Sequence, residues 1–249
     1  MEKILYLRSD KTVLRRDDKI VKIFSGSYSK ADVLNEALNQ ARAEETNLNV
    51  PTVYEVTKAD GKWAIVSQYI EGKTLRAMME ENPEKREEYL DYFIGLQMAI
   101  HAEKCPLLIR MRDKLRRKIA DAEDIEATTR YDLIDRLERM PTHYKVCHGD
   151  FNPTNAVFTE EGEEYLLDFS HAAAGDPLTD AAITYLYFYL REGERAAEEY
   201  LGIFLAESGA GEAEAKKRLP LAAAVWLLRA NEEEKEKLLP FLKNAAETA

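Results

Sequence analysis

Two aspartates, with an asparagine between them, stand in short apolar or small-residue stretches of the sequence. Asp150 and Asn155 both lie in HGDFNPTNAVF, and Asp168 lies in LLDFSHAAAGDP. Phosphoryl transfer asks little covalent chemistry of a protein, so its needs are a group that orients or deprotonates the attacking hydroxyl and oxygen ligands for Mg²⁺. Asp150 would serve the first need, and Asn155 and Asp168 would serve the second.

Histidine and cysteine residues near Asp150 allow two other interpretations. Histidine is the common side chain whose ordinary pKa lies near neutrality, so His148 could act as a general base, although Asp150 is the better-placed group. His143, Cys147 and His148 suggest zinc ligands, but the spacing lacks a fourth ligand and alternates across an expected strand. We therefore expect no zinc site at this strand.

The composition of the chain limits the class of partner. With 249 residues, 45% of them hydrophobic, the chain can bury one large core or two modest ones. A net charge of −11 disfavours nucleic-acid binding, which rests on basic surfaces, and suits a cationic small molecule better. The cysteines Cys105 and Cys147 are far apart and form no CxxC pair, which fits a reducing cytosol. No apolar span reaches 18 residues and the apolar run at the N-terminus is too short for a signal peptide, so we expect a cytoplasmic protein that does not bind membranes.

The elements that must position these residues change from strand to helix along the chain. Short β-rich runs, one amphipathic helix from Ser29 and a closing hairpin predict the order β-β-β-α-β-β, with strands at 4–7, 12–16, 19–24, 52–56 and 63–70. Helical periodicity then dominates, with helices expected at 74–81, 84–103, 110–122, 124–139, 183–190 and 219–228. Two short apolar strands, within KVCHGD and EYLLDF, lead into the segments that carry Asp150 and Asp168.

The two quoted stretches also resemble a known family. HGDFNPTN together with LLDFSHAAAGDPLTDAA resembles the aminoglycoside phosphotransferase/choline kinase family, whose fold is similar to that of protein kinases, and the match runs in order across about residues 4–190. The resemblance implies an α+β, two-lobed protein-kinase-like fold. A small, mostly β nucleotide-binding lobe is expected at residues 1–70, and a larger, mostly α lobe with the catalytic loop and acceptor site at residues 71–249. The hinge between them is expected at Glu71-Gly72-Lys73.

By this resemblance Asp150 is the catalytic aspartate, and Asn155 and Asp168 are Mg²⁺ ligands. The motif histidine, His148, would brace the catalytic loop rather than act as a base. Asp180 in GDPLTDAA could be a simple acid at a helix N-terminus, but the resemblance suggests that it holds the catalytic loop from below. Asp176 could have the same role or belong to the substrate rim.

The resemblance also implies contacts to the nucleotide. Lys22 in IVKIF would contact the ATP phosphates, although a lysine between apolar residues is most often the exposed face of a strand. Glu36 on the following helix would pair with Lys22 as in kinases, and its place among Val33, Ala37 and Leu38 favours it over the alternatives, Glu44 and Glu45. Further nucleotide contacts are expected from the side chain of Ser9 and from the backbone that would bind adenine, at Gln68, Tyr69 and Ile70.

These expectations lead to one leading function and two alternatives. The leading function is an ATP- and Mg²⁺-dependent phosphotransferase that phosphorylates an alcohol group of an aminoglycoside-like or other small acceptor. A choline, ethanolamine or sugar-type kinase is the first alternative, and Gly149 between His148 and Asp150 tilts the sequence away from the choline type. The second is a catalytically idle nucleotide-binding module, because the turn RSDKTVL at 8–14 contains no glycine to cradle phosphates.

Overall fold

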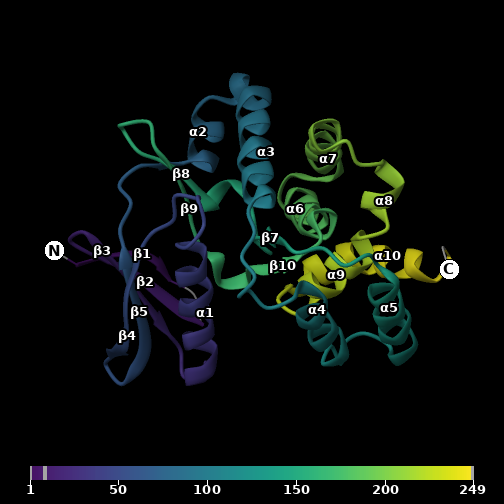
Figure 1. Ribbon diagram of the computed structural model, residues 1–249, viewed down its shortest axis with the longest axis horizontal. Coiled ribbons are helices and arrows are strands. Elements are labelled where there is room, and N and C mark those ends of the chain that lie inside the picture. Colours follow the sequence, from purple (N-terminus) through teal and green to yellow (C-terminus); the bar gives the residue numbers. More distant parts are fainter. Residues whose placement is uncertain (1, 8–9, 248–249) are drawn as a thin grey trace. The chain divides into compact units, whose positions relative to one another are not determined.

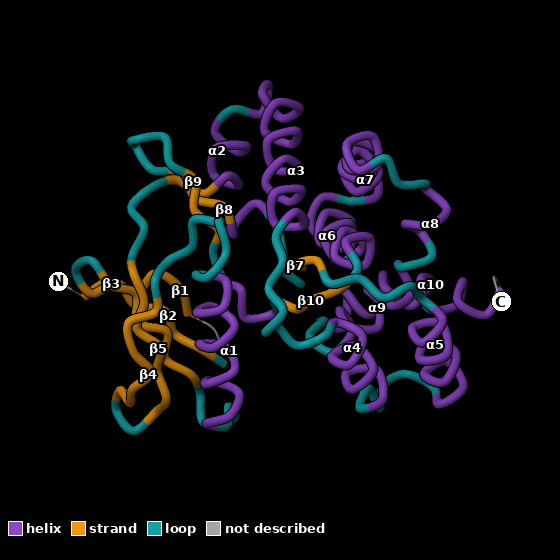
Figure 2. The backbone as a smooth tube through the Cα atoms, viewed as in Figure 1, coloured by secondary structure: helices purple, strands orange, loops and turns teal. Residues whose placement is uncertain are grey.

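The computed structural model describes residues 2–7 and 10–247, and its chain packs into two compact units. The first unit contains the chain up to Arg86 together with Pro153–His171, and the second contains Glu87–Asn152 together with the chain from Ala172 onward. Strands dominate the first unit and helices the second (Figure 1 and Figure 2). This grouping follows packing alone, so the functional lobe boundary between residues 70 and 71, and the hinge at 71–73, stay predictions.

The first unit is built on a five-stranded antiparallel sheet. Its strands follow the order β1-β2-β3-β5-β4 and are β1 (Glu2–Leu7), β2 (Lys11–Arg16), β3 (Lys19–Phe24), β4 (Val53–Ala59) and β5 (Lys62–Gln68). The turn between β4 and β5 has positive φ at both Asp60 (50°) and Gly61 (76°), which is what a tight Asp-Gly hairpin needs. The predicted order β-β-β-α-β-β is therefore present, with α1 (Lys30–Ala43) between β3 and β4.

The two faces of this sheet carry separate apolar clusters. One face packs against α1, where Phe24 and Ile65 meet Val33 and Ala37 of the helix. The other face holds a separate apolar cluster made of Leu14, Val21, Ala64 and Val66. Because side chains alternate along a strand, Lys22 shares the α1 side with Phe24 and with its cross-strand partner Ile65. A lysine in the middle of an apolar strand thus points toward a helix.

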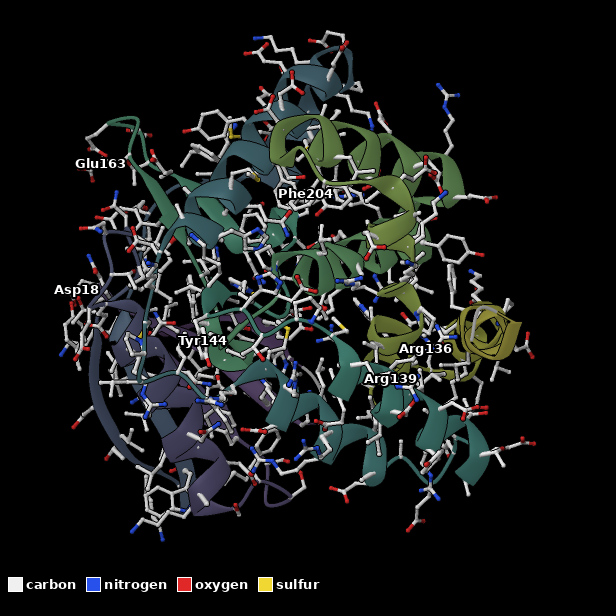
Figure 3. All side chains as sticks on the ribbon, turned by 45° about the vertical axis from the view of Figure 1, so that its right-hand side comes forward. Asp18, Arg136, Arg139, Tyr144, Glu163 and Phe204 are labelled. Carbon is white, nitrogen blue, oxygen red and sulfur yellow. The ribbon has the colours of Figure 1, made fainter. Side chains whose placement is uncertain are left out.

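A second, three-stranded sheet completes the first unit. Its order is β6-β8-β9, from β6 (Lys73–Thr74), β8 (Ala156–Phe158) and β9 (Glu164–Leu166), and α2 (Leu75–Glu81) follows β6. Glu163 lies in the exposed turn between β8 and β9 (Figure 3). Gly72 packs so tightly here that a Cβ atom at this position would lie 2.2 Å from the carbonyl oxygen of Phe158. Short 3₁₀ turns lie after α2 at Pro83–Lys85, before β8 at Pro153–Asn155 and after β9 at Phe169–His171.

The second unit is a bundle of helices around one two-stranded sheet. The sheet pairs β7 (Lys145–Cys147) with β10 (Ala173–Gly175), and the helices are α3 (Arg86–Ala102), α4 (Met111–Ala120), α5 (Ala127–Arg139), α6 (Pro177–Glu192), α7 (Glu194–Ser208), α8 (Glu212–Lys216), α9 (Leu219–Leu227) and α10 (Glu232–Glu247). Fully buried aromatic rings of Phe93, Phe151, Phe188, Tyr200 and Phe204 form its core, and Figure 3 labels Phe204 on α7.

The predicted elements are present, and the structure adds helices α7, α8 and α10 and three short strands. The helices predicted at 74–81, 84–103, 110–122 and 124–139 correspond to α2, α3, α4 and α5, and those predicted at 183–190 and 219–228 correspond to α6 and α9. Strands β6, β8 and β10 have only two or three residues, too few to show a period, and were not predicted. No helix in the described ranges combines the length and the apolar character that a membrane crossing requires.

Candidate active site

A three-residue charge network lies inside the first unit. The Nζ atom of Lys22 on β3 donates to Oε1 of Glu36 at 2.6 Å and to Oδ1 of Asp168 at 3.2 Å. The three side chains are largely withdrawn from solvent, with exposed fractions of 19% for Lys22, 15% for Glu36 and 32% for Asp168. The structure thus brings together a lysine and an aspartate that are 146 residues apart in the chain.

Helix α1 places Glu36 opposite Lys22. The helix begins with a capping box, in which the Ser29 hydroxyl accepts from the Asp32 backbone and the Asp32 side chain accepts from the Ser29 backbone. Val33 and Ala37, on either side of Glu36, are buried against the sheet, so the glutamate is carried to the same face. The Lys22–Glu36 ion pair expected from the sequence is present.

Leu38 and the two alternative glutamates, Glu44 and Glu45, differ from Glu36 in their surroundings. Leu38, expected to face inward, is 46% exposed, because it lies beyond the stripe that packs on the sheet. Glu44 accepts a hydrogen bond from the backbone N–H of Val53 at 2.9 Å, which ties the end of α1 to β4. Glu45 is exposed. Neither alternative glutamate therefore takes the place of Glu36 beside the lysine.

Asp168 is held in a backbone conformation that few residues adopt. Its φ of 59° is in the left-handed region, which aspartate tolerates better than most residues but which still costs about 1–3 kcal/mol. The flanking backbone is fixed on both sides. Leu167 donates to the carbonyl of Asn155 at 2.8 Å, and Phe169 donates to Oε1 of Gln40 on α1 at 3.3 Å. Strain supported in this way is typical of a functional position.

The charges of this network stabilise one another. Burial by itself lowers the pKa of Lys22, but the carboxylates of Asp168 and Glu36 outweigh it and raise the pKa above the ordinary value. Burial likewise raises the pKa of Asp168, but the positive charges of Lys22, Lys11 and His171 outweigh it, so this pKa lies below the usual range. Both Lys22 and Asp168 are therefore ionised at neutral pH.

A cavity of about 430 Å³ opens on the Lys22 side of the five-stranded sheet. Its apolar lining includes Val13, Ile20 and Ile65, which share the sheet face of Lys22 by register. All the residues expected to touch nucleotide or metal, apart from Ser9, line the same cavity and belong to the first unit: Lys22, Glu36, Gln68, Tyr69, Ile70, Asn155 and Asp168. The strands, α1 and the segment around Asp168 therefore all contribute residues to the lining of this one cavity.

The backbone N–H groups near the end of β5 are only partly engaged. Gln68 donates its N–H to the Thr52 carbonyl at 2.9 Å, and Tyr69 donates to the Asp18 carbonyl at 2.9 Å. The N–H of Ile70 donates to no acceptor in the ranges that the structure describes. Ser9 lies outside the described residues, and its nucleotide contact stays a prediction.

In the second unit, Asp180 holds the backbone that leads to Asp150. Its fully buried carboxylate accepts hydrogen bonds from the N–H of Gly149 at 2.7 Å, from the N–H of His148 at 3.1 Å and from Nε2 of His101 at 2.9 Å. Burial raises the pKa of Asp180. The hydrogen bond from His101 and the electrostatic interaction with this histidine outweigh that effect, so the net shift of the pKa is downward. Gly149 has a φ of 77°, a conformation that favours glycine. Sequence reasoning did not find His101.

Asp150 itself pairs with an arginine that the sequence did not indicate. Its Oδ1 accepts from Nη2 of Arg229 at 2.7 Å, and the two side chains are 25% and 32% exposed. Both residues belong to the second unit. Arg229 follows α9 and lies 79 residues from Asp150 in the chain, so no local pattern connects the two.

The histidines and cysteine near Asp150 have structural surroundings. His148 is fully buried, and its ring lies 5.5 Å from that of Phe151. Ligand atoms of His101, Cys147 and Asp180 lie within 4.8 Å of one another. Burial raises the pKa of the Cys147 thiol well above its ordinary value, so the thiolate that a metal needs is disfavoured there. The oxygens of Asp180 are already used by three donors.

Comparison with known proteins identifies the family. Residues 6–217 match the profile of the phosphotransferase enzyme family, APH. The chain belongs to this family. Among curated proteins, none matches the sequence. The family assignment confirms the prediction of a phosphotransferase with an alcohol group as acceptor, and the individual residue roles within this APH family member stay predictions.

Solved structures similar to this APH family member show its fold. A thermostable mutant of aminoglycoside phosphotransferase APH(4)-Ia in its apo form has 16% identity and a TM-score of 0.72, over 100% of this chain and 94% of that one. A choline/ethanolamine kinase family protein from Mesorhizobium loti has 17% identity and a TM-score of 0.63, over 100% and 88%. An aminoglycoside-3'-phosphotransferase of type VIII has 19% identity and a TM-score of 0.63, over 90% and 92%. The predicted α+β, protein-kinase-like fold is confirmed.

Proposed function

We propose that this protein transfers the γ-phosphoryl group of ATP, with Mg²⁺, to a hydroxyl group of a small molecule. The observation that carries the proposal is the contact of Lys22 with both Glu36 and Asp168 in a cavity that Asn155 also lines. Kinases use a strand lysine paired with a helix glutamate, and an aspartate and an asparagine as metal ligands. The types and the placement of these four residues match that set.

The cavity suits a nucleoside. Its volume of about 430 Å³ lies within the range of small-molecule sites, and the side chains of Val13, Ile20 and Ile65 offer apolar surface to a base. Of the three backbone positions expected to bind adenine, Ile70 is the one whose N–H donates to nothing else among the described residues. We therefore assign the adenine hydrogen bond to this N–H group. A structural neighbour, a thermostable mutant of APH(4)-Ia, forms a ternary complex with AMP-PNP and hygromycin B, at 16% identity and a TM-score of 0.69.

The polar residues of the cavity fit phosphate and Mg²⁺. An ammonium group has three N–H donors, and Lys22 directs two of them to carboxylates, which leaves one for a phosphate oxygen. The carboxylate of Asp168, kept ionised by Lys22, and the amide oxygen of Asn155 are hard oxygen donors of the kind that Mg²⁺ prefers. Bound Mg²⁺ would neutralise the charge of the phosphates.

Asp150 is assigned to the transfer step. Its carboxylate would orient the acceptor hydroxyl for attack on the γ-phosphorus and accept the hydroxyl proton, while the bond to the β,γ-bridging oxygen breaks and ADP leaves. The hydrogen bonds of Asp180 to Gly149 and His148 hold the backbone that carries this carboxylate. Asp150 is partly exposed, so a solute can reach it.

The test uses two lysines of the same strand. Lys22→Met should leave the fold intact and lower kcat/KM for ATP by roughly 10²–10³-fold, as expected for removal of a donor to developing charge. Lys19→Met removes an exposed lysine from the same strand and should change neither the fold nor kcat/KM for ATP. Binding of ATP with and without Mg²⁺ is measured by calorimetry, and turnover by ADP release with a panel of hydroxyl compounds. Equal activity of both variants, or a parent protein that binds no ATP, would contradict the proposal.

A further inference from the structure

Two basic side chains, Arg229 and Lys118, lie near Asp150 in the second unit, and a third, Lys114, lies near both of them. Arg229 contacts the carboxylate directly, with Nη2 2.7 Å from Oδ1. The guanidinium of Arg229 also lies over the ring of Trp226, 4.0 Å from its centre. Lys114 and Lys118 lie on α4, a helix that packs against α9, the element just before Arg229. We call Lys114, Lys118 and Arg229 the basic cluster.

The two lysines of the basic cluster point the same way. They are four residues apart on α4, which places them on one face of the helix. Both are partly buried, and both are close enough to Arg229 to be influenced by its charge. Burial, followed by the charge of Arg229, lowers the pKa of Lys118 to about 8. Burial, followed by the charge of Lys118, lowers the pKa of Lys114 to about 7.

The positive charge of the basic cluster is not balanced by the carboxylates around it. Asp150 supplies one negative charge to Lys118 and Arg229, and Lys114, with a pKa of about 7, adds about half a positive charge at neutral pH. Asp180 also attracts Lys114, but its oxygens are engaged by His101 and two backbone N–H groups. The ammonium of Lys118 forms no hydrogen bond or ion pair with any residue in the described ranges. Lys22 differs from these lysines, since two carboxylates meet its ammonium and its pKa is raised.

We propose that the basic cluster binds an acid group of the acceptor, a carboxylate or a phosphate, so that the substrate of the transfer is an anionic hydroxyl compound. The inference rests on the proposed function, because the transfer step is what brings an acceptor to Asp150. An acid group would supply the missing negative charge. A polycationic acceptor would instead add like charges to a site that already has too many.

Arg229 has the geometry for such a ligand. A guanidinium presents five N–H donors in a planar fork that matches carboxylate and phosphate oxygens. One of them donates to Asp150, and the others donate to no residue that the structure describes. Arg229 can therefore hold Asp150 and an acid group of the acceptor together, which would place the acceptor hydroxyl next to the carboxylate that orients it.

Trp226 makes the inference testable without turnover. The guanidinium of Arg229 lies over the indole of Trp226. Binding of an anion to Arg229 should therefore change the fluorescence of Trp226. The chain has two tryptophans, and the second, Trp63, is in the first unit and is removed by Trp63→Phe. In this background, glycerate, glycerol 3-phosphate, glycerol and 2-amino-1,3-propanediol are titrated without nucleotide or metal. They share a three-carbon hydroxyl skeleton and differ in charge.

We expect at least one of the two acids to bind at least tenfold more tightly than glycerol or the amine, and comparison of the acids tells carboxylate from phosphate. Lys118→Met and Arg229→Gln should each weaken that binding by about ten- to a hundredfold, as expected for loss of one charge-assisted hydrogen bond. Arg229→Lys should recover part of it. Lys237→Met removes a lysine of α10 that pairs with Glu233, and it should have no effect. Thermal unfolding confirms that each variant is folded.

Two results would overturn the inference. One is equal binding of acid, neutral and amine probes, or tighter binding of the amine. The other would come from steady-state kinetics with the acceptor found for the parent enzyme. In that assay we expect Lys118→Met to raise the KM of the acceptor and to leave the KM of ATP unchanged. A rise in the KM of ATP alone would assign the basic cluster to the nucleotide instead. Failure of the proposed function would be seen separately, as absence of ATP binding in the first unit.

Discussion

Replacement of Asp180 by asparagine should destabilise the second unit strongly, although the two side chains have nearly the same shape. The carboxylate accepts three hydrogen bonds, from His101, His148 and Gly149, and has no exposed surface. In asparagine an NH₂ group replaces one of the two carboxylate oxygens. This NH₂ group would face one of the three donors, which would then lack an acceptor.

The magnitude follows from these contacts. A hydrogen bond to a charged group is worth about 1.5–3 kcal/mol and a neutral one about 0.5–1.5, so loss of the charge costs about 1 kcal/mol at each bond. The opposed donor adds about 1–3 kcal/mol, which brings the expected loss in the free energy of unfolding to about 4–6 kcal/mol. At roughly 2–4 °C for each kcal/mol, the Tm should fall by more than about 8 °C.

The assay is thermal unfolding followed by circular dichroism, with an exposed aspartate as control. Asp135 pairs with Arg139 on α5, where the side chains are 40% and 79% exposed, and Figure 3 labels Arg139. Asp135→Asn should cost less than about 0.5 kcal/mol. If Asp180→Asn lowered the Tm no more than Asp135→Asn does, the assignment of Asp180 as the brace of the catalytic loop would be refuted.

The same residue predicts a pH dependence. The pKa of Asp180 is lower in the folded protein than in the unfolded chain, so its stabilisation is present above the unfolded pKa and is lost as the pH falls through the folded pKa. The parent protein should therefore lose stability in acid more steeply than Asp180→Asn does. Parallel curves of Tm against pH for the two proteins would contradict this cause of the pKa shift.

Three further substitutions separate the steps of the proposed reaction from the packing of the fold. Asp150→Asn should lower kcat by about 10²–10⁴-fold and leave the dissociation constant of ATP unchanged, and a loss of ATP binding would instead make Asp150 a metal ligand or a fold element. Asp168→Ala should remove the dependence of ATP affinity on Mg²⁺, measured by calorimetry, and an unchanged dependence would exclude this carboxylate as a ligand. Gly72→Ala should cost about 1–3 kcal/mol, because its Cβ would lie 2.2 Å from a backbone oxygen, whereas Gly26→Ala meets no atom within 4 Å and should leave the Tm unchanged.

The sequence determined the elements whose signal is local. Alternating apolar residues marked the strands of the five-stranded sheet, helical spacing marked α1 to α5, and Asp-Gly marked the turn between β4 and β5. The polar residues in apolar settings, Lys22, Asp168 and Asp180, could also be selected, because isolated charges in such places need partners. These features depend on residues within a few positions of one another, so the chain itself displays them.

The tertiary structure decided which of these residues meet. Glu36 pairs with Lys22, and Glu44 anchors β4 instead, because α1 packs on the sheet with Val33 and Ala37 inward. The net charge of −11 gave no indication of the basic cluster, since a sum over the chain does not show where the charges lie. Arg229 reaches Asp150 across 79 residues of sequence, and Lys114 and Lys118 join it from a third segment. Contacts of this kind depend on how distant elements pack, which no short-range pattern records.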